Sequence, residues 1–296
     1  MRIFVSLLAA LALFCGTARA ADSHHAFYKA SLEANISDTA QKVKDALETA
    51  GFAIIGEYSP EDKPSLKVIV FSSQALQEEL LRVKDRGLLA AALKVGLMET
   101  GGKTAVSIVN PAYLFRAYLM KEFPAHEAPL MKIDDLVKQA LQVAVKQDLT
   151  PFGGALSAKE LAHYHYMVGM EYFDDPVWLK KFGSFEEAVE KIRKNLADRK
   201  GGVAPVYEII SQSGKTAVFG VTLGSKEKGE PHFLPIIGED HLASLPYEII
   251  VVDKIATMLH GRYRIALHWP QLTMGTFGKI MSTPGDIEET MKSLTN

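Results

Sequence analysis

An amphipathic segment followed by several apolar runs occurs twice along this chain, and this duplication constrains the fold more than any single motif. In residues 37–51 apolar side chains recur at helical spacing. Residues 184–202 repeat the pattern, so that Ile192 falls 149 residues after Val43. The sequence therefore predicts two domains of like architecture.

Each half is predicted to contain a strand, a helix, four further strands and a closing helix. The first half has strand-like runs at 27–34, 52–58, 66–73, 91–99 and 103–109. The second half has them at 163–173, 204–211, 215–223, 245–253 and 262–269. Trp269-Pro270 is expected to correspond to Asn110-Pro111. We expect an α+β protein of two similar domains, each with a curved, mainly antiparallel sheet backed by helices.

Four segments follow from this pattern. Residues 1–20 are predicted to be a signal peptide, 21–150 the first domain, 151–162 a linker and 163–296 the second domain.

The N-terminus has the pattern of a secretory signal. Arg2 precedes an apolar stretch that ends at Cys15, and Ala18-Arg19-Ala20 is a small-x-small cleavage site. The stretch is too short to cross a bilayer. Lipidation of Cys15 is the alternative, but bulky Phe14 beside it disfavours that reading. We predict a periplasmic or secreted protein without a transmembrane segment.

Cysteine content and charge exclude several classes of function. Cys15 is the one cysteine of the chain, so a mature protein cut after Ala20 has no disulfide, catalytic thiol or thiolate metal ligand. The formal net charge of −2 becomes more negative when Arg2 and Arg19 leave with the signal. That balance offers no basic surface for nucleic acid.

The stretch GGKTAVSIVNP, residues 101–111, has the letters of a phosphate-binding loop without its context. Position 97 is leucine where such a loop needs glycine, and an apolar strand follows Lys103 instead of a helix. We predict a hairpin turn. Pro111 then begins a helix that Asn110 can cap.

At this point the sequence resembles the family called domain of unknown function 302 (DUF 302). The likeness lies in the amphipathic helix followed by GFAIIGEY, in GGKTAVSIVNP, and in LASLPYEIIVVD before GRYRIALHWP. The resemblance implies two tandem copies across nearly the whole mature chain. Family members often carry Leu-Pro-Cys before the fourth strand. Here that place holds Leu245-Pro246-Tyr247 in one copy and Ala91-Ala92-Leu93 in the other, so a role tied to that cysteine is absent.

HYHYMVGM, residues 163–170, is the strongest local signal for a metal site. On a strand, His163, His165 and Met167 would project from one face, and two imidazoles with a thioether favour copper. Haem is the other cofactor that such a set could hold. A third imidazole from His232, His260 or His268 would complete the site. The alternative is an ordinary exposed strand whose other residues, Tyr164, Tyr166 and Val168, pack against the helix within 184–199.

Two further features favour structural interpretations. Asp240-His241 could act as an acid/base pair in a hydrolase, but no nucleophile motif accompanies it, and a solvated loop fits better. The methionines of the closing segment 278–294 are expected to pack rather than to bind.

The sequence favours a non-enzymatic binding module and leaves catalysis open. A sheet backed by helices on one face needs a ligand, a partner or the sister domain on the other face. We therefore predict a small ligand or a protein partner at the sheet faces between the domains, with residues that the sequence does not identify. A homodimer is compatible with this pattern.

Overall fold

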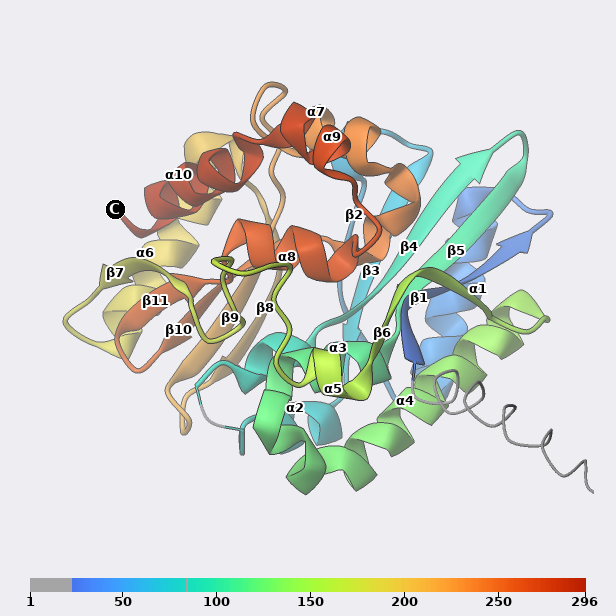
Figure 1. The fold of residues 1–296 in the computed structure, drawn as a ribbon, viewed down its shortest axis with the longest axis horizontal. Helices are drawn as coiled ribbons and strands as arrows, with labels where there is room; N and C mark the ends of the chain where they lie inside the picture. The colour runs from blue at the N-terminus through green and yellow to red at the C-terminus, as the bar shows by residue number, and fades with distance from the viewer. Residues whose placement is uncertain (1–22, 84) are drawn as a thin grey trace, which may run out of the picture.

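The computed structural model describes residues 23–83 and 85–296, so the predicted signal peptide lies outside the described residues. The described chain folds into two antiparallel sheets side by side, each with its own helices (Figure 1). No helix in the described part is long and apolar enough to span a membrane. The protein is of mixed α+β class, as the sequence predicts.

The first half builds a six-stranded sheet in the order β2-β3-β4-β5-β1-β6. Its elements are β1 (Ser23–Leu32), α1 (Ile36–Thr49), β2 (Ala53–Tyr58), β3 (Leu66–Ser72), α2 (Gln74–Leu80), the 3-10 helix η2 (Gly87–Ala91), β4 (Leu93–Thr100), β5 (Lys103–Val109), α3 (Pro111–Leu119), α4 (Phe123–Val145), β6 (Thr150–Ser157) and α5 (Ala158–Leu161). Shorter 3-10 turns lie at Pro60–Asp62 and Met120–Glu122.

The second half builds a five-stranded sheet in the order β7-β11-β10-β9-β8. Its elements are β7 (Val177–Lys181), α6 (Phe185–Ala197), β8 (Pro205–Ser211), β9 (Thr216–Val221), α7 (Glu230–Ile237), the 3-10 helix η5 (Glu239–Ser244), β10 (Tyr247–Val252), β11 (Ile255–Met258), α8 (Gly261–His268), α9 (Met274–Phe277) and α10 (Thr283–Thr295). Shorter 3-10 turns lie at Lys200–Gly202 and Gly278–Ile280. Read from β8, the order repeats that of the first sheet from β2 to β1.

Local chemistry explains the elements that the sequence predicted well. The side chain of Asn35 accepts a hydrogen bond from Asp38 N and caps α1, and Ser184 caps α6 through Glu187 N. Gly51, at φ +87°, ends the first helix. The turn between β4 and β5 places Gly101 and Gly102 at positive φ, which confirms the hairpin.

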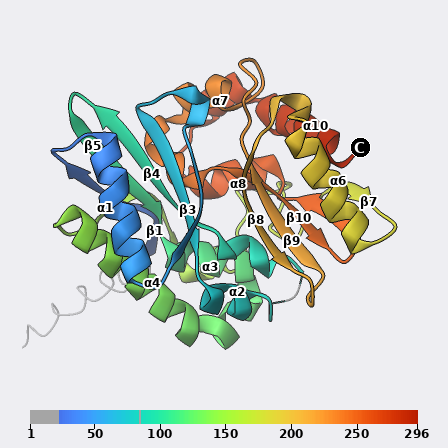
Figure 2. The ribbon, with the colours of Figure 1, turned by 180° about the vertical axis from the view of Figure 1, so that it is seen from behind.

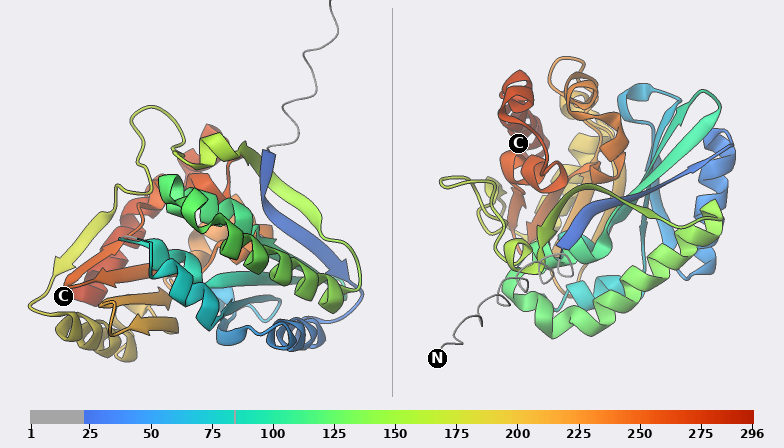
Figure 3. Two further views of the ribbon diagram at one scale, coloured as in Figure 1. Left: turned by 90° about the horizontal axis from the view of Figure 1, so that it is seen from below. Right: turned by 45° about the vertical axis from the view of Figure 1, so that its right-hand side comes forward.

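Three segments differ from the prediction. Residues 163–173 form no strand; β7 begins at Val177 and takes the place beside β11. Residues 261–268 form α8 instead of a strand, and β11 supplies the missing strand before it. Residues 151–162, expected as a linker, contain most of β6 and α5, and β6 pairs with β1 (Figure 3).

The predicted match of Trp269-Pro270 with Asn110-Pro111 is wrong for the same reason. In the structure α3 starts at Pro111 directly after β5, and α8 starts at Gly261 directly after β11. The N-cap positions are Asn110 and His260. The corresponding positions therefore differ by 150 residues, close to the 149 that separate Val43 from Ile192.

Helices cover the outer face of each sheet, and the two domains cover each other's inner faces. Figure 2 shows α1 on the outside of one sheet and α6 on the outside of the other. Inside, η5 of the second domain packs on β4 so closely that a Cβ at Gly96 would lie 2.6 Å from Leu242 Cβ. Two hydroxyls cross between α3 and α8 in a reciprocal way: Tyr113 donates to Leu267 O at 2.7 Å, and Tyr263 donates to Ala117 O at 3.5 Å.

Candidate functional site

A cavity of about 480 Å³ lies in the second domain, on the side of α8 away from the first domain. Its walls come from the loop before β7, from α8 and the residues just after it, and from the stretch that runs from α9 into the start of α10. The lining residues are mostly apolar, and they include four methionines: Met167, Met170, Met274 and Met281. Three of these, Met167, Met274 and Met281, are among the exposed large apolar residues of the protein.

Helix α8 contacts the first domain with one side and leaves its other side to line the cavity. Tyr263 and Leu267 face α3 of the first domain through the reciprocal hydrogen bonds. Arg262, Ala266 and Trp269 line the cavity. One short helix thus belongs both to the domain interface and to the candidate site.

Charged groups at one end of the cavity are paired with each other. Arg262 forms an ion pair with Glu171, and His260 Nε2 lies 3.4 Å from the same carboxylate. Burial lowers the pKa of His260, so this imidazole is largely neutral at neutral pH. At the rim, Glu288 is paired with Lys292. The remaining wall is therefore dominated by apolar side chains.

The structure places the side chains predicted to share a metal in the loop before β7, not on a strand. The rings of His163 and His165 both lie against Tyr172, with centroids at 4.4 and 4.5 Å, and His165 Nδ1 is 2.8 Å from Met167 O. Met167 lines the cavity. Among the described residues no group of three or more His, Cys, Asp or Glu is placed to hold a metal ion. Copper or haem binding remains an untested prediction.

The neighbouring tyrosines and valine also depart from the predicted strand. Tyr164 is buried, but it packs against Tyr263 and donates to Ala266 O at 2.9 Å instead of contacting the helix that begins at Phe185. Val168 is 95% exposed. The expected alternation of faces is wrong because this segment has no ladder partner and follows a loop path.

His241 lies in a closed environment rather than in a solvated loop. Its ring is buried, Nδ1 donates to Asp240 at 2.6 Å, and Nε2 contacts the amide of Gln271 at 2.9 Å. Burial acts to raise the pKa of Asp240, but the hydrogen bond and charge of His241 outweigh it and lower that pKa. With both nitrogens engaged, His241 presents no free base to a substrate.

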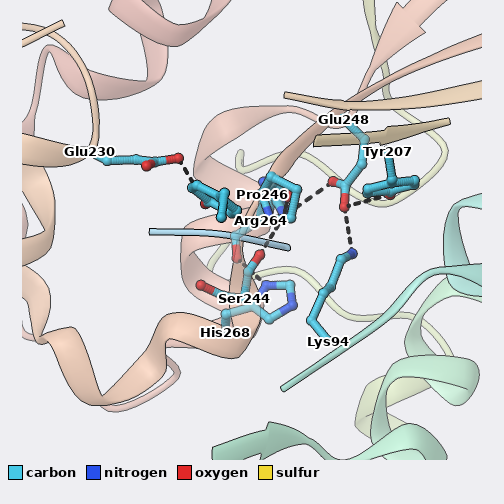
Figure 4. Close-up of polar contacts among 9 residues, drawn as sticks. Lys94, Tyr207, Glu230, Ser244, Pro246, Glu248, Arg264 and His268 are labelled. Carbon is cyan, nitrogen blue, oxygen red and sulfur yellow. Dashed lines mark hydrogen bonds and ion pairs between the residues drawn. The ribbon is translucent and has the colours of Figure 1, made fainter. Parts of the chain in front are cut away.

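The inner faces of the two domains meet in a buried cluster of charges (Figure 4). The Glu248 carboxylate accepts from Lys94 at 2.5 Å and pairs with Arg264 at 3.1 Å, while the Tyr207 hydroxyl lies 3.4 Å away. Arg264 also donates to the carbonyls of Ser244 and Pro246. This cluster joins the domains at their inner sheet faces, where we expected a small ligand or a protein partner from the sequence.

Burial perturbs the ionisation of groups around this cluster. It lowers the pKa of His268 to about 3, so that ring stays neutral, and it raises the pKa of Glu230 to about 7. Glu230 accepts from the Tyr58 hydroxyl at 3.1 Å. These groups hold protein elements to one another and leave the cavity beside α8 as the candidate ligand site.

Sequence reasoning missed this cavity. The methionines of the closing segment were expected to pack, which is right for buried Met291 and wrong for exposed Met281. A gathering of methionines near 167–170 and 274–281 was the available signal.

Comparison with known proteins finds a family match within the first domain. Residues 28–144, from β1 into α4, match the model of the domain of unknown function DUF302. A solved crystal structure of an uncharacterized conserved DUF302 protein from Bacillus stearothermophilus is 17% identical; the likeness covers 40% of this chain and 98% of that one, with a TM-score of 0.34. No curated protein matches the chain.

Proposed function

We propose that this protein is an exported, non-enzymatic binding protein with two DUF302-like domains, and that it holds a small apolar molecule in the cavity beside α8. The cavity carries the proposal. Its volume of about 480 Å³ lies within the usual range of small-molecule sites, and apolar lining with a few polar groups is typical of such sites.

The exposed methionines support the same function. Met167, Met274 and Met281 leave a large apolar surface in contact with water at one opening. Methionine is common on surfaces that accept varied apolar partners because its side chain is flexible and polarizable. A ligand that enters this opening would remove that surface from water.

The sheet order supports a second DUF302-like domain. The strands from β7 to β11 repeat the order and antiparallel pairing of β1 to β5, although the matched residues end at 144. In this proposal each inner face binds the sister domain, and the ligand lies outside that interface.

Binding of the neutral fluorescent probe 1-N-phenylnaphthylamine tests the function. We expect saturable fluorescence enhancement with the mature protein. Met274→Asp and Met281→Asp should weaken binding at least about 10-fold, because a ligand would desolvate the new charge. Both side chains are exposed, so the fold should persist.

Leu136→Asp is the matched control, because it places the same charge on an exposed apolar residue of α4 outside the cavity. Its affinity should equal that of the unsubstituted protein. Absence of saturable binding, or equal weakening by the control, would refute the proposed cavity function.

Export has a separate test. The sequence of the N-terminus supports cleavage after Ala20, which the intact mass of protein from the periplasmic fraction measures directly. A mass that retains residues 1–20 would contradict export by this signal.

A further inference from the structure

Every exposed methionine in the described part of the chain lines the cavity. Met167, Met274 and Met281 are 49%, 57% and 72% exposed, and all three belong to the wall. The other methionines of residues 23–83 and 85–296 are half-buried or buried: Met98, Met120, Met131, Met170, Met258 and Met291. The thioethers that face water are therefore gathered at one place.

These three thioethers are open to a dissolved oxidant. Cys15 is the one cysteine of the sequence and lies outside the described residues, so no thiol in residues 23–83 and 85–296 competes with them. Met258 and Met291, at 1% and 0% exposed, lie in the packed core, where the oxidant has little access. Exposure thus selects the cavity methionines for oxidation.

A peroxide converts each exposed thioether to a sulfoxide. A lone pair of the sulfur forms a bond to one oxygen of hydrogen peroxide, and the O–O bond breaks. The proton of the attacked oxygen moves to the leaving hydroxide, which departs as water. The sulfur loses two electrons and the peroxide gains them. A flexible apolar side chain thereby becomes a polar one with a strong hydrogen-bond acceptor.

The wall has few groups that could pair with the new oxygen. Arg262 is already paired with Glu171, and His260 Nε2 lies 3.4 Å from the same carboxylate. A sulfoxide at the opening would therefore keep water as its partner. An apolar ligand would have to displace that water without replacing its hydrogen bond, which opposes binding.

We infer that Met167, Met274 and Met281 form a redox-sensitive modification site, and that their oxidation by a peroxide lowers the affinity of the cavity for apolar ligands. This inference rests on the proposed cavity function and names a regulation of that site. Because the three side chains are exposed, sulfoxides there leave the core packed. Methionine sulfoxide reductases would restore the thioethers.

Peroxide treatment of the mature protein tests the inference, with catalase removing the excess before binding is measured. Peptide mass spectrometry should find sulfoxide first at the three exposed positions and last at Met258 and Met291. The affinity for 1-N-phenylnaphthylamine should fall about 10-fold. It should return after treatment with two reductases, one for each sulfoxide epimer. A thermal melt checks that the oxidised protein stays folded.

Two variants separate this site from other oxidation. The triple variant Met167→Leu, Met274→Leu and Met281→Leu removes the sulfurs and keeps apolar side chains of similar volume. Each protein is compared with itself before and after peroxide, and the affinity of the triple variant should change by less than about 2-fold. Met131→Leu is the matched control, because Met131 is half-buried in α4 outside the cavity. It should lose affinity as the original protein does.

The outcomes separate the inference from the function beneath it. If the untreated protein shows no saturable binding of the probe, the cavity function itself fails. If it binds and sulfoxides at the three positions leave its affinity unchanged, binding stands and the inference is wrong. A loss of affinity that the triple variant shares, or that the reductases do not reverse, also overturns the inference.

Discussion

The two domains share one strand order, but they differ in how far the first strand of each domain pairs with its neighbour. In the first domain β1 pairs with β5 from Leu32 as far as Phe27 opposite Val109. In the second domain β7 pairs with β11 only up to Val177 opposite Met258, and the preceding chain leaves the sheet. That released chain forms one wall of the cavity. The short edge strand thus leaves the preceding chain free to form part of the site in the second domain.

The N-cap positions show the same contrast. Asn110 is buried, and its amide donates to His25 O at 2.9 Å, which ties the start of α3 to β1. His260, at the start of α8, faces Glu171 and the cavity instead. Corresponding positions therefore serve sheet pairing in one domain and the candidate site in the other.

The largest expected effect concerns Glu248, which joins the domains. Glu248→Gln leaves Lys94 and Arg264 buried together without a counter-charge, so we expect a loss of about 3–5 kcal/mol in the free energy of unfolding. Lys94→Met should cost less, about 1–2 kcal/mol, because Arg264 still pairs with the carboxylate. Urea denaturation measures both. Equal losses of unfolding free energy for Glu248→Gln and Lys94→Met would contradict the role of Glu248 as the shared counter-charge of Lys94 and Arg264.

Glu230 gives the second domain a pH dependence. Burial raises the pKa of Glu230 from 4.5 to about 7. Because the folded state holds this proton more tightly, the contribution to stability is present below about pH 4.5 and is lost as the pH rises to about 7. It amounts to about 3 kcal/mol. The corresponding first residue of α2, Gln74, is exposed and does not titrate.

Glu230→Gln should abolish this dependence. The stability difference between the original protein and the variant should change by about 3 kcal/mol between about pH 4 and about pH 8, in favour of the variant at the higher pH. Urea denaturation across this range measures it. Parallel pH profiles would contradict the assigned pKa.

The reciprocal tyrosines provide a finer comparison across the domain interface. Tyr113→Phe removes the 2.7 Å hydrogen bond to Leu267 O and should cost about 1 kcal/mol. Tyr263→Phe removes the 3.5 Å contact with Ala117 O and should cost less. The double variant should show whether the two contacts are coupled. A larger loss of unfolding free energy for Tyr263→Phe than for Tyr113→Phe would contradict the order that the two distances predict.

The smallest effect is expected at His163 and His165. Replacing both with Ala should change stability by less than about 1 kcal/mol, because these rings lie in a loop against Tyr172. Metal analysis of protein from the periplasmic fraction tests the copper or haem prediction. Bound metal that disappears in the double variant would support it, and metal-free native protein would refute it.

Segments with local signals could be predicted, and segments fixed by tertiary contacts could not. The helix after Ser184 carries its own cap and a clear amphipathic period. Residues 261–268 are buried on nearly all sides between the domain interface and the cavity, so α8 shows no helical period and its alternation resembles a strand. The prediction for 163–173 failed in the opposite way, because an alternating pattern cannot form a strand without a partner.

The cavity could not be predicted from the sequence for a related reason. Its walls come from residues 166–170, from α8 with the residues just after it, and from residues 274–288, and no spacing in the sequence relates these three segments. Only the structure brings their methionines to one opening.

Methyl NMR of the protein labelled at its methionines tests the difference between the domains most directly. During titration with 1-N-phenylnaphthylamine, the methyl signals of Met167, Met170, Met274 and Met281 should shift. Those of Met98 and Met131 in the first domain should stay in place. Single Met→Leu substitutions assign the signals. Shifts confined to the first domain, or no shifts at saturating probe, would contradict a ligand site beside α8.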